Sequence, residues 1–192
     1  EAKLIGSPTG CQDYWAAVRG GMNILSYDYG KTKIKTISCD EALSFQDRVI
    51  VCYSGKSRDS AMNNWEIFKQ FFNQEEKVSA CLQEIGVLSE ECALAFAAGR
   101  INCALEYSKQ EWDLRQKLWP GVETQETKKI SQLAEKSGAS FTRVCGAGGG
   151  GVMVVFTQEG SRQQVVDELV EQNVEILATD FTDLGLRVSI SH

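Results

Sequence analysis

Residues 141–156 read Phe-Thr-Arg-Val-Cys-Gly-Ala-Gly-Gly-Gly-Gly-Val-Met-Val-Val-Phe, two largely apolar stretches separated by a run of glycines. The flanks Phe141 to Cys145 and Val152 to Phe156 are short and rich in residues that favour strands. We therefore predict two strands joined by a glycine loop, defined here as Gly146-Ala147-Gly148-Gly149-Gly150-Gly151.

The glycine loop is a candidate phosphate-binding segment. Glycine has no Cβ and adopts positive φ readily, so backbone N–H groups in such a run can approach an anion closely. The run also satisfies G-x-G-x-x-G, but that fingerprint opens a helix, whereas here a strand follows, which argues against a Rossmann site. A tight connection between two strands, with no ligand, is an equally open interpretation.

The remaining patterns place this hairpin in an α+β domain. After residue 48 the predicted order is strand, several helices, strand, strand, helix, strand, the split β-α-β arrangement of a ferredoxin-like domain with inserted helices. The predicted strands and helices are Val49–Tyr53, a helix from Ser60, one from Ser89 to Leu118, Glu126–Lys136, a helix that Ser161 opens with a capping box, and a last strand at Leu186–Ile190.

The sequence pattern divides the chain into two parts. Residues 47–192 are expected to form the ferredoxin-like C-terminal domain. Residues 1–46 hold a predicted helix at Gln12–Arg19 and a predicted hairpin of Met22–Tyr27 and Lys33–Ile37. We expect that segment to be the tail of a preceding α+β domain.

Composition excludes several classes of protein. Of 192 residues, 43% are hydrophobic and 24% charged, and no apolar run approaches the ~18 residues that cross a bilayer. A net charge of −6 disfavours nucleic acid as a partner. The seven cysteines lack C-x-x-C spacing, which argues against zinc or a disulfide framework and fits a reducing cytoplasm. The single histidine, His192, leaves little room for His-based catalysis.

A polar loop follows the predicted strand at Val49–Tyr53. It reads Ser-Gly-Lys-Ser-Arg-Asp-Ser over residues 54–60, but Ile50 stands where a P-loop needs its first glycine. Its cations and hydroxyls suit a phosphate or a sugar, so the candidate substrate-binding residues are Lys56, Ser57, Arg58 and Ser60. A solvated charged loop with a helix N-cap is the alternative.

Gln12 and Asp13 begin a predicted helix after a glycine-rich stretch. A carboxylate at that position can orient or deprotonate an acceptor hydroxyl, and the helix dipole keeps it ionised. Asp13 is therefore a candidate catalytic residue and Gln12 a candidate substrate-binding residue. The alternative is that Asp13 only complements the helix dipole.

In this order, the three segments resemble the GHMP kinases, the family of galactokinase, homoserine kinase, mevalonate kinase and phosphomevalonate kinase. Residues 10–21, Gly-Cys-Gln-Asp-Tyr-Trp-Ala-Ala-Val-Arg-Gly-Gly, resemble the family's Gln-Asp…Ala…Gly-Gly segment. Residues 144–151 match its third motif, Gly-x-Gly-x-Gly-Gly. Residues 53–60 are similar to the Thr-Gly-x-x-Arg-x-Ser loop of the heptose-phosphate kinase branch.

The resemblance implies transfer of the γ-phosphate of ATP, with Mg²⁺, to a small acceptor, here a sugar or sugar phosphate. It implies that Asp13 acts as base or hydroxyl-orienting carboxylate, that Gly146 to Gly151 support the transferred phosphate, and that Ser57 and Arg58 face the acceptor. Small-molecule substrate and ATP are the expected partners. Neither a metal ligand nor an oligomeric state follows from these residues.

One family motif is missing from the 192 residues. Pro-x-x-x-Gly-Leu-Gly-Ser-Ser-Ala, which wraps the ATP phosphates, does not occur, and neither does the helix glutamate that helps to hold Mg²⁺. The resemblance implies that both lie upstream of Glu1, so this segment alone is expected to be inactive. A non-catalytic, pseudokinase-like metabolite-binding module is the alternative, and the acidic composition argues against a third possibility, a ferredoxin-like RNA-binding domain.

Overall fold

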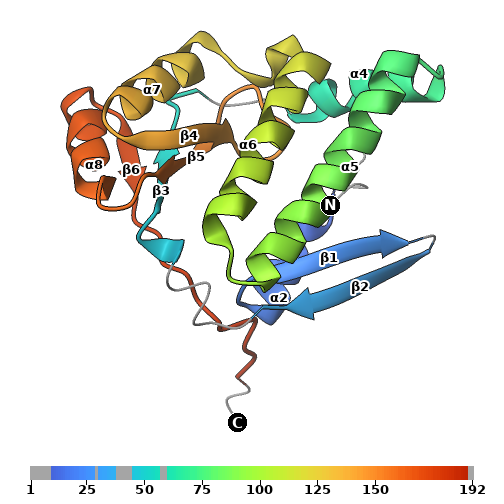
Figure 1. Cartoon of the computed structure of the whole chain (residues 1–192), viewed down its shortest axis with the longest axis horizontal. Coiled ribbons are helices and arrows are strands. Elements are labelled where there is room, and N and C mark those ends of the chain that lie inside the picture. The colour runs from blue at the N-terminus through green and yellow to red at the C-terminus, as the bar shows by residue number, and fades with distance from the viewer. Residues whose placement is uncertain (1–9, 29, 38–44, 57–59, 190–192) are drawn as a thin grey trace.

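The computed structural model describes residues 10–28, 30–37, 45–56 and 60–189, with the side chains of residues 60–64 excepted. It combines helices with two antiparallel sheets (Figure 1). The helices are α2 (Gln12–Arg19), α4 (Ser60–Phe72), α5 (Glu76–Ala97), α6 (Ile101–Leu118), the short 3-10 helix η1 (Pro120–Val122), α7 (Gln125–Lys136) and α8 (Arg162–Glu171). The strands are β1 (Asn23–Asp28), β2 (Lys31–Thr36), β3 (Val49–Tyr53), β4 (Ala139–Val144), β5 (Val152–Thr157) and β6 (Glu175–Leu177). Among the described helices, none is both long enough and apolar enough to span a membrane.

The four-stranded sheet has the order β4-β5-β3-β6, and every neighbouring pair is antiparallel. The first strand of this unit, β3, thus lies between the third and the fourth, which is the ferredoxin-like arrangement. The predicted α+β class is confirmed. The separate hairpin β1-β2 corresponds to the predicted hairpin near the start of the chain.

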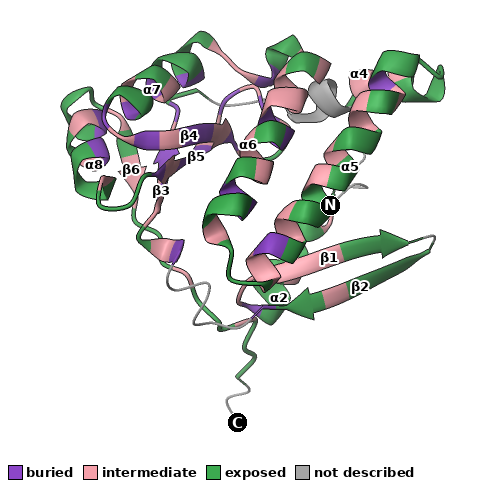
Figure 2. Cartoon of the chain, viewed as in Figure 1, coloured by how far each residue is buried: buried purple, intermediate pink, exposed green. Residues whose placement is uncertain are grey.

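One face of the sheet carries the main hydrophobic core (Figure 2). Successive strand side chains point to opposite faces, so Met153 and Val155 of β5 share the face of Ile50 and Cys52 of β3. Helices α7 and α8 cover this face, and α8 contributes Val165 and Leu169, both with no exposed surface.

The opposite face carries an aromatic cluster centred on Phe45. The Phe45 ring lies 5.3 Å from that of Phe96 on α5 and 5.8 Å from that of Phe156 on β5. Phe156 in turn stacks on Phe141 of β4 at 4.5 Å. These contacts, worth about 0.5–1.5 kcal/mol per pair beyond area burial, join the helical hairpin α5-α6 to the sheet.

The segment before β3 is held by the end of the chain. The Gly21 N–H donates to the Thr182 carbonyl oxygen at 2.7 Å, and the Leu186 N–H donates to the Val18 carbonyl oxygen at 3.1 Å. The stretch after β6 therefore runs back along α2 (Figure 1). The two parts of the chain that the sequence separates at residue 46 are tied together at this point.

Three local predictions were wrong. Ser89 does not begin a helix, since it lies within α5 and its hydroxyl donates to the Ile85 carbonyl oxygen at 2.7 Å; the break falls at residues 98–100 instead. The described residues 186–189 form no strand, and the fourth strand is β6. Ser161 is the N-cap residue of α8 but makes no side-chain capping hydrogen bond.

We predict that the core position Val165 controls stability far more than its neighbour Val170. Both valines lie on α8, but Val165 has no exposed surface and Val170 is 55% exposed. Val165→Ala should lower the free energy of unfolding by about 2 kcal/mol, because it removes two buried methyl groups and leaves a cavity. Val170→Ala, which removes the same atoms, should change it by less than about 0.5 kcal/mol. Urea denaturation measures both, and equal losses would contradict the assigned core.

Candidate functional site

The glycine loop connects β4 to β5 and is fastened by backbone hydrogen bonds to two other segments. The Gly149 N–H donates to the Val122 carbonyl oxygen at 2.9 Å. The Gly151 N–H donates to the Lys56 carbonyl oxygen at 2.8 Å, and the Ser54 N–H donates to the Gly151 carbonyl oxygen at 2.9 Å. The loop is therefore held between η1 and the segment that leaves β3.

Two glycines are required by close approach as well as by conformation. Gly148 has φ +82°, and a Cβ there would lie 2.8 Å from the Val122 carbonyl oxygen. Gly150 has φ +115°, and its Cβ would lie 3.0 Å from the Lys56 carbonyl oxygen. Real Cβ atoms rarely make such contacts, so any larger residue would push the loop away from η1 and from Lys56.

Lys56 borders the glycine loop through its backbone carbonyl, and its side chain pairs with α7. Its Nζ lies 3.6 Å from Glu126 Oε2 in the first turn of α7, and each side chain is about half exposed, at 51% and 48%. Such a solvated pair contributes roughly 0–1 kcal/mol, so it is easily exchanged for another partner. The Lys56 ammonium is therefore available to an anion at the loop.

Hydrogen bonding lowers the pKa of Glu126. The Thr124 side chain makes the largest contribution, followed by the Glu126 backbone N–H; burial opposes them, and Lys56 lowers the pKa further. Thr124 is also the N-cap of α7, where it and Thr127 form a reciprocal capping box. The carboxylate is thus held charged at the start of the helix, facing Lys56.

A cavity of about 340 Å³ adjoins this pair. Its walls are the end of β3 at Tyr53–Gly55, one face of α7 and the turn at residues 172–175. Ile130 and Leu133 form its apolar side, whereas Glu126 and Lys129 bring charges to its edge. The space is large enough for a small polar metabolite.

Asp13 lies in the first turn of α2 and is exposed. The Cys11 thiol, just before the helix, lies 3.7 Å from the Tyr27 hydroxyl of β1. Burial, then Cys11, then the Asp13 charge raise the pKa of Tyr27. Asp13 therefore lies near Tyr27 of the hairpin β1-β2, and Figure 1 shows the helix α2 beside this hairpin. The meeting of Asp13 with the glycine loop in one hollow stays a prediction.

The structure describes the other predicted site residues to different extents. Gln12 begins α2 and is exposed. Ser57 and Arg58 lie outside the described residues, and Ser60 begins α4 without a described side chain. The structure brings Lys56 and residues 146–151 together, while their roles stay predictions.

Sequence reasoning missed the contribution of η1 and α7 to this site. Val122 supplies the carbonyl group that holds Gly149, and Glu126 supplies the anion opposite Lys56. The pattern Thr124-x-x-Thr127 with an acidic residue in the first turn is the signal that a search for helix N-termini can find.

The fold and the loop define a ferredoxin-like α+β domain whose β4-β5 connection is built for close backbone approach. A family model described as "GHMP kinases C terminal" matches residues 93–175, which include the glycine loop. This match confirms the resemblance to the GHMP kinases seen in the sequence.

Solved structures of similar fold include several small-molecule kinases. The mevalonate kinase of L. major in complex with R-mevalonate has a TM-score of 0.68 at 21% identity over 83% of this chain and 48% of its own. A D-glycero-D-manno-heptose 1-phosphate kinase from Bacteroides thetaiotaomicron has a TM-score of 0.67 at 15% identity over 99% and 53%. The phosphomevalonate kinase of Streptococcus pneumoniae, with phosphomevalonate and AMPPNP, has a TM-score of 0.59 at 16% identity over 80% and 43%.

These likenesses concern the fold. The chain spans about half the length of the solved structures it matches. It matches none of the curated proteins.

Gly148→Ala tests the close approach of the loop to η1. We expect this variant to lose about 1–3 kcal/mol more stability than Gly160→Ala. Both glycines have positive φ, at +82° and +77°, so both substitutions carry the backbone penalty of about 1–2 kcal/mol. Nothing lies within 4 Å of a Cβ at Gly160, so the difference isolates the clash with Val122. Thermal denaturation of both variants measures it, and equal losses would show that Val122 yields without cost.

A second test concerns Glu126. We expect Thr124→Ala to raise the pKa of the Glu126 carboxyl towards its ordinary value more than Lys56→Met does, because the Thr124 hydrogen bond is the larger cause. A folded-state pKa below the unfolded one stabilises the protein above the unfolded pKa, and this stabilisation is lost as the pH falls through the folded value. NMR titration of the carboxyl carbon gives the pKa in each variant. A larger effect of Lys56→Met would reverse the assignment.

Proposed function

We propose that the protein containing this chain is an ATP-dependent kinase that transfers the γ-phosphate to a hydroxyl of a sugar or sugar phosphate. The clamped glycine loop with Lys56 at its side is the observation that carries this proposal. The match of residues 93–175 to the GHMP C-terminal family model supports a kinase-type function. The heptose 1-phosphate kinase among the similar folds supports the sugar-phosphate class of acceptor.

The chain's own groups suit one side of phosphoryl transfer. That reaction depends mainly on positioning and on neutralising charge over the transferred group. The glycine loop offers a backbone surface without Cβ atoms, and the Lys56 ammonium offers a positive charge that is only weakly engaged by Glu126. ATP supplies the phosphoryl group when bound. Lys56, with Ser57, Arg58 and Ser60, is proposed to hold the acceptor.

Asp13 is proposed to orient or deprotonate the acceptor hydroxyl, with Gln12 beside it. Its place in the first turn of α2 supports this role, because the helix dipole favours the ionised carboxylate. Mg²⁺ is implied by the family, but the described residues contain no group of three or more acidic, His or Cys side chains that could hold it.

We predict that Asp13→Asn in the full-length protein slows turnover by ~100-fold or more, the usual scale for loss of a general base. The assay uses ATP with a panel of sugars, sugar phosphates and mevalonate. Asp167→Asn, at a carboxylate on α8 that pairs with Gln163, is the matched control and should leave turnover unchanged. Unchanged turnover in Asp13→Asn would remove this residue from the mechanism.

The same assay separates the enzyme from a non-catalytic module. Turnover of any acceptor by the full-length protein supports the kinase, whereas acceptor binding without turnover favours a metabolite-binding, pseudokinase-like module. The 192-residue chain alone is proposed to be inactive, because it lacks the Gly-Leu-Gly-Ser-Ser motif. A measurable kinase rate from these residues alone would refute that statement.

A further inference from the structure

A second hollow lies away from the glycine loop, between β1 and the helical hairpin α5-α6. Its volume is about 390 Å³, within the range of small-molecule sites. The aromatic cluster forms its floor through Phe45, Phe96 and Phe156, and the β1 side adds Ile24 and Leu25. Of the described residues that line this apolar cleft, none carries a charge.

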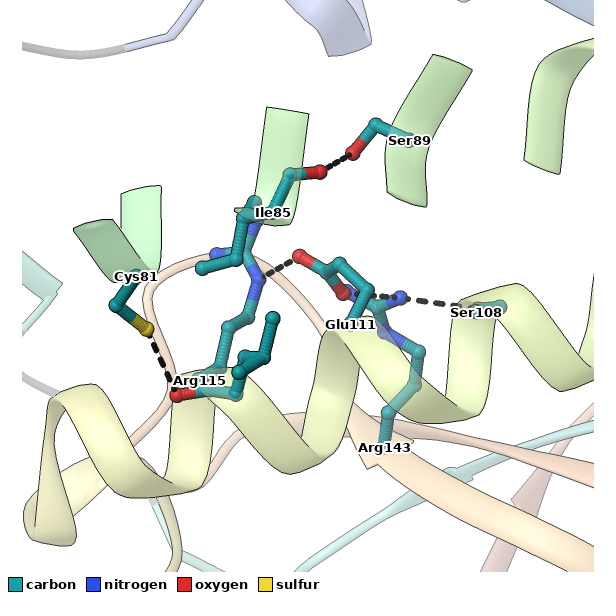
Figure 3. Close-up of polar contacts among 8 residues, drawn as sticks. Cys81, Ile85, Ser89, Ser108, Glu111, Arg115 and Arg143 are labelled. Atoms are coloured by element: carbon teal, nitrogen blue, oxygen red, sulfur yellow. Dashed lines mark hydrogen bonds and ion pairs between the residues drawn. The ribbon is translucent and has the colours of Figure 1, made fainter. Parts of the chain in front are cut away.

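The polar residues that line the apolar cleft are Asn23 on β1 and Ser89, Cys92 and Ser108 on α5 and α6, and most are already engaged. The Asn23 side-chain amide donates to the Gly20 carbonyl oxygen at 2.9 Å. The Ser89 hydroxyl donates to the Ile85 carbonyl oxygen at 2.7 Å, and the Cys92 thiol donates to the Ala104 carbonyl oxygen at 3.3 Å. Ser108 differs, because its hydroxyl oxygen accepts a hydrogen bond from Arg143 Nη1 at 3.2 Å (Figure 3). A polar lining group is thus bonded directly to a cation.

Arg143, which donates to Ser108, belongs to a cluster with more positive than negative groups. Glu111, only 5% exposed, pairs with Arg143 at 3.1 Å and with Arg115 one helical turn along α6. One carboxylate therefore faces two guanidinium groups. Arg143 also lies over the Trp112 ring at 5.7 Å, which fixes its position (Figure 3 shows the ion pairs).

The field of this cluster reaches the apolar cleft. Burial raises the pKa of the Cys92 thiol, and of the two nearby charges Arg143, which lowers the pKa, has a larger effect than Glu111, which raises it. Cys92 lines the cleft, so the charge of Arg143 acts on a group in the cleft wall. The cleft thus combines an apolar body with one end that favours negative charge.

We propose that the apolar cleft binds a small amphipathic anion, with its hydrocarbon part against Phe45, Phe96 and Phe156 and its carboxylate or phosphate at Ser108 beside Arg143. The Ser108 hydroxyl can turn its proton towards the ligand, because it accepts from Arg143. This site is separate from the glycine loop and does not depend on the proposed kinase activity.

The first test compares three probes on the 192-residue chain by ¹H–¹⁵N NMR titration. Octanoate should bind at least about tenfold more tightly than octylammonium, which has the same body and the opposite charge, since a charged hydrogen bond is worth roughly one decade or more. Acetate, the head group alone, should bind too weakly to measure. Shifts from octanoate should centre on Cys92, Phe96, Leu105 and Ser108. Equal affinities for octanoate and octylammonium, or shifts centred elsewhere, would overturn the proposal.

Variants then separate the charge from the cavity. Arg143→Met should weaken octanoate binding about tenfold and leave octanol binding unchanged, while Glu111 keeps Arg115 as its partner. Arg115→Met is the matched control, because it removes a cation from the same carboxylate but none from Ser108, and should change octanoate binding less than threefold. Ala93→Leu, which fills the cleft, should abolish binding of both octanoate and octanol. Equal losses of octanoate binding in the two arginine variants, or full binding in Ala93→Leu, would refute the site. The comparison of probes on the unaltered chain remains a valid test whether or not a variant folds.

Discussion

The close approach of the β4-β5 connection to Val122 and Lys56 is the constraint on which the candidate site depends. It is possible only without Cβ atoms at Gly148 and Gly150. Three backbone hydrogen bonds hold the loop against the segment that follows β3 and against η1, which precedes α7. Backbone groups hold the loop in place. A ligand can therefore bind there without displacing the contacts that set the shape of the loop.

The sheet explains why Lys56 and Gly151 meet although they lie 95 residues apart in the sequence. Tyr53, the last residue of β3, pairs with Val152, the first residue of β5, in an antiparallel register. The chain leaving β3 therefore emerges beside the chain entering β5, and the Ser54 N–H continues the ladder to Gly151.

Much of the fold was predictable from the sequence, because its strong patterns are local. The strands around the glycine run and the helix over residues 126–136 follow from periodicity and turn residues alone. The strand β6 was missed, since its three residues, Glu175 to Leu177, are too few to show a strand pattern and become a strand by pairing with β3. The predicted strand over residues 186–190 had the right composition, but Leu186 and Val188 are 70% and 81% exposed and the backbone there pairs with α2.

Less of the candidate site was predictable, because sequence patterns are local and the site depends on contacts between distant segments. Glycine and lysine positions are visible in the sequence, whereas the carbonyl of Val122 and the carboxylate of Glu126 matter only through tertiary placement.

Two separate attachments hold Asp13, the candidate catalytic residue, and the glycine loop, the candidate phosphate-binding segment. Asp13 is on a helix held by the returning stretch at Thr182 and Leu186, and the glycine loop is held within the ferredoxin-like sheet. The aromatic cluster around Phe45 lies between them, because it joins Phe181 of that returning stretch to Phe96 and Phe156. The apolar cleft opens on this same cluster, so a ligand there would contact the packing that connects the two attachments. The aromatic contacts of Phe45 with Phe181, Phe96 and Phe156 are thus one packed connection between the returning stretch and the sheet.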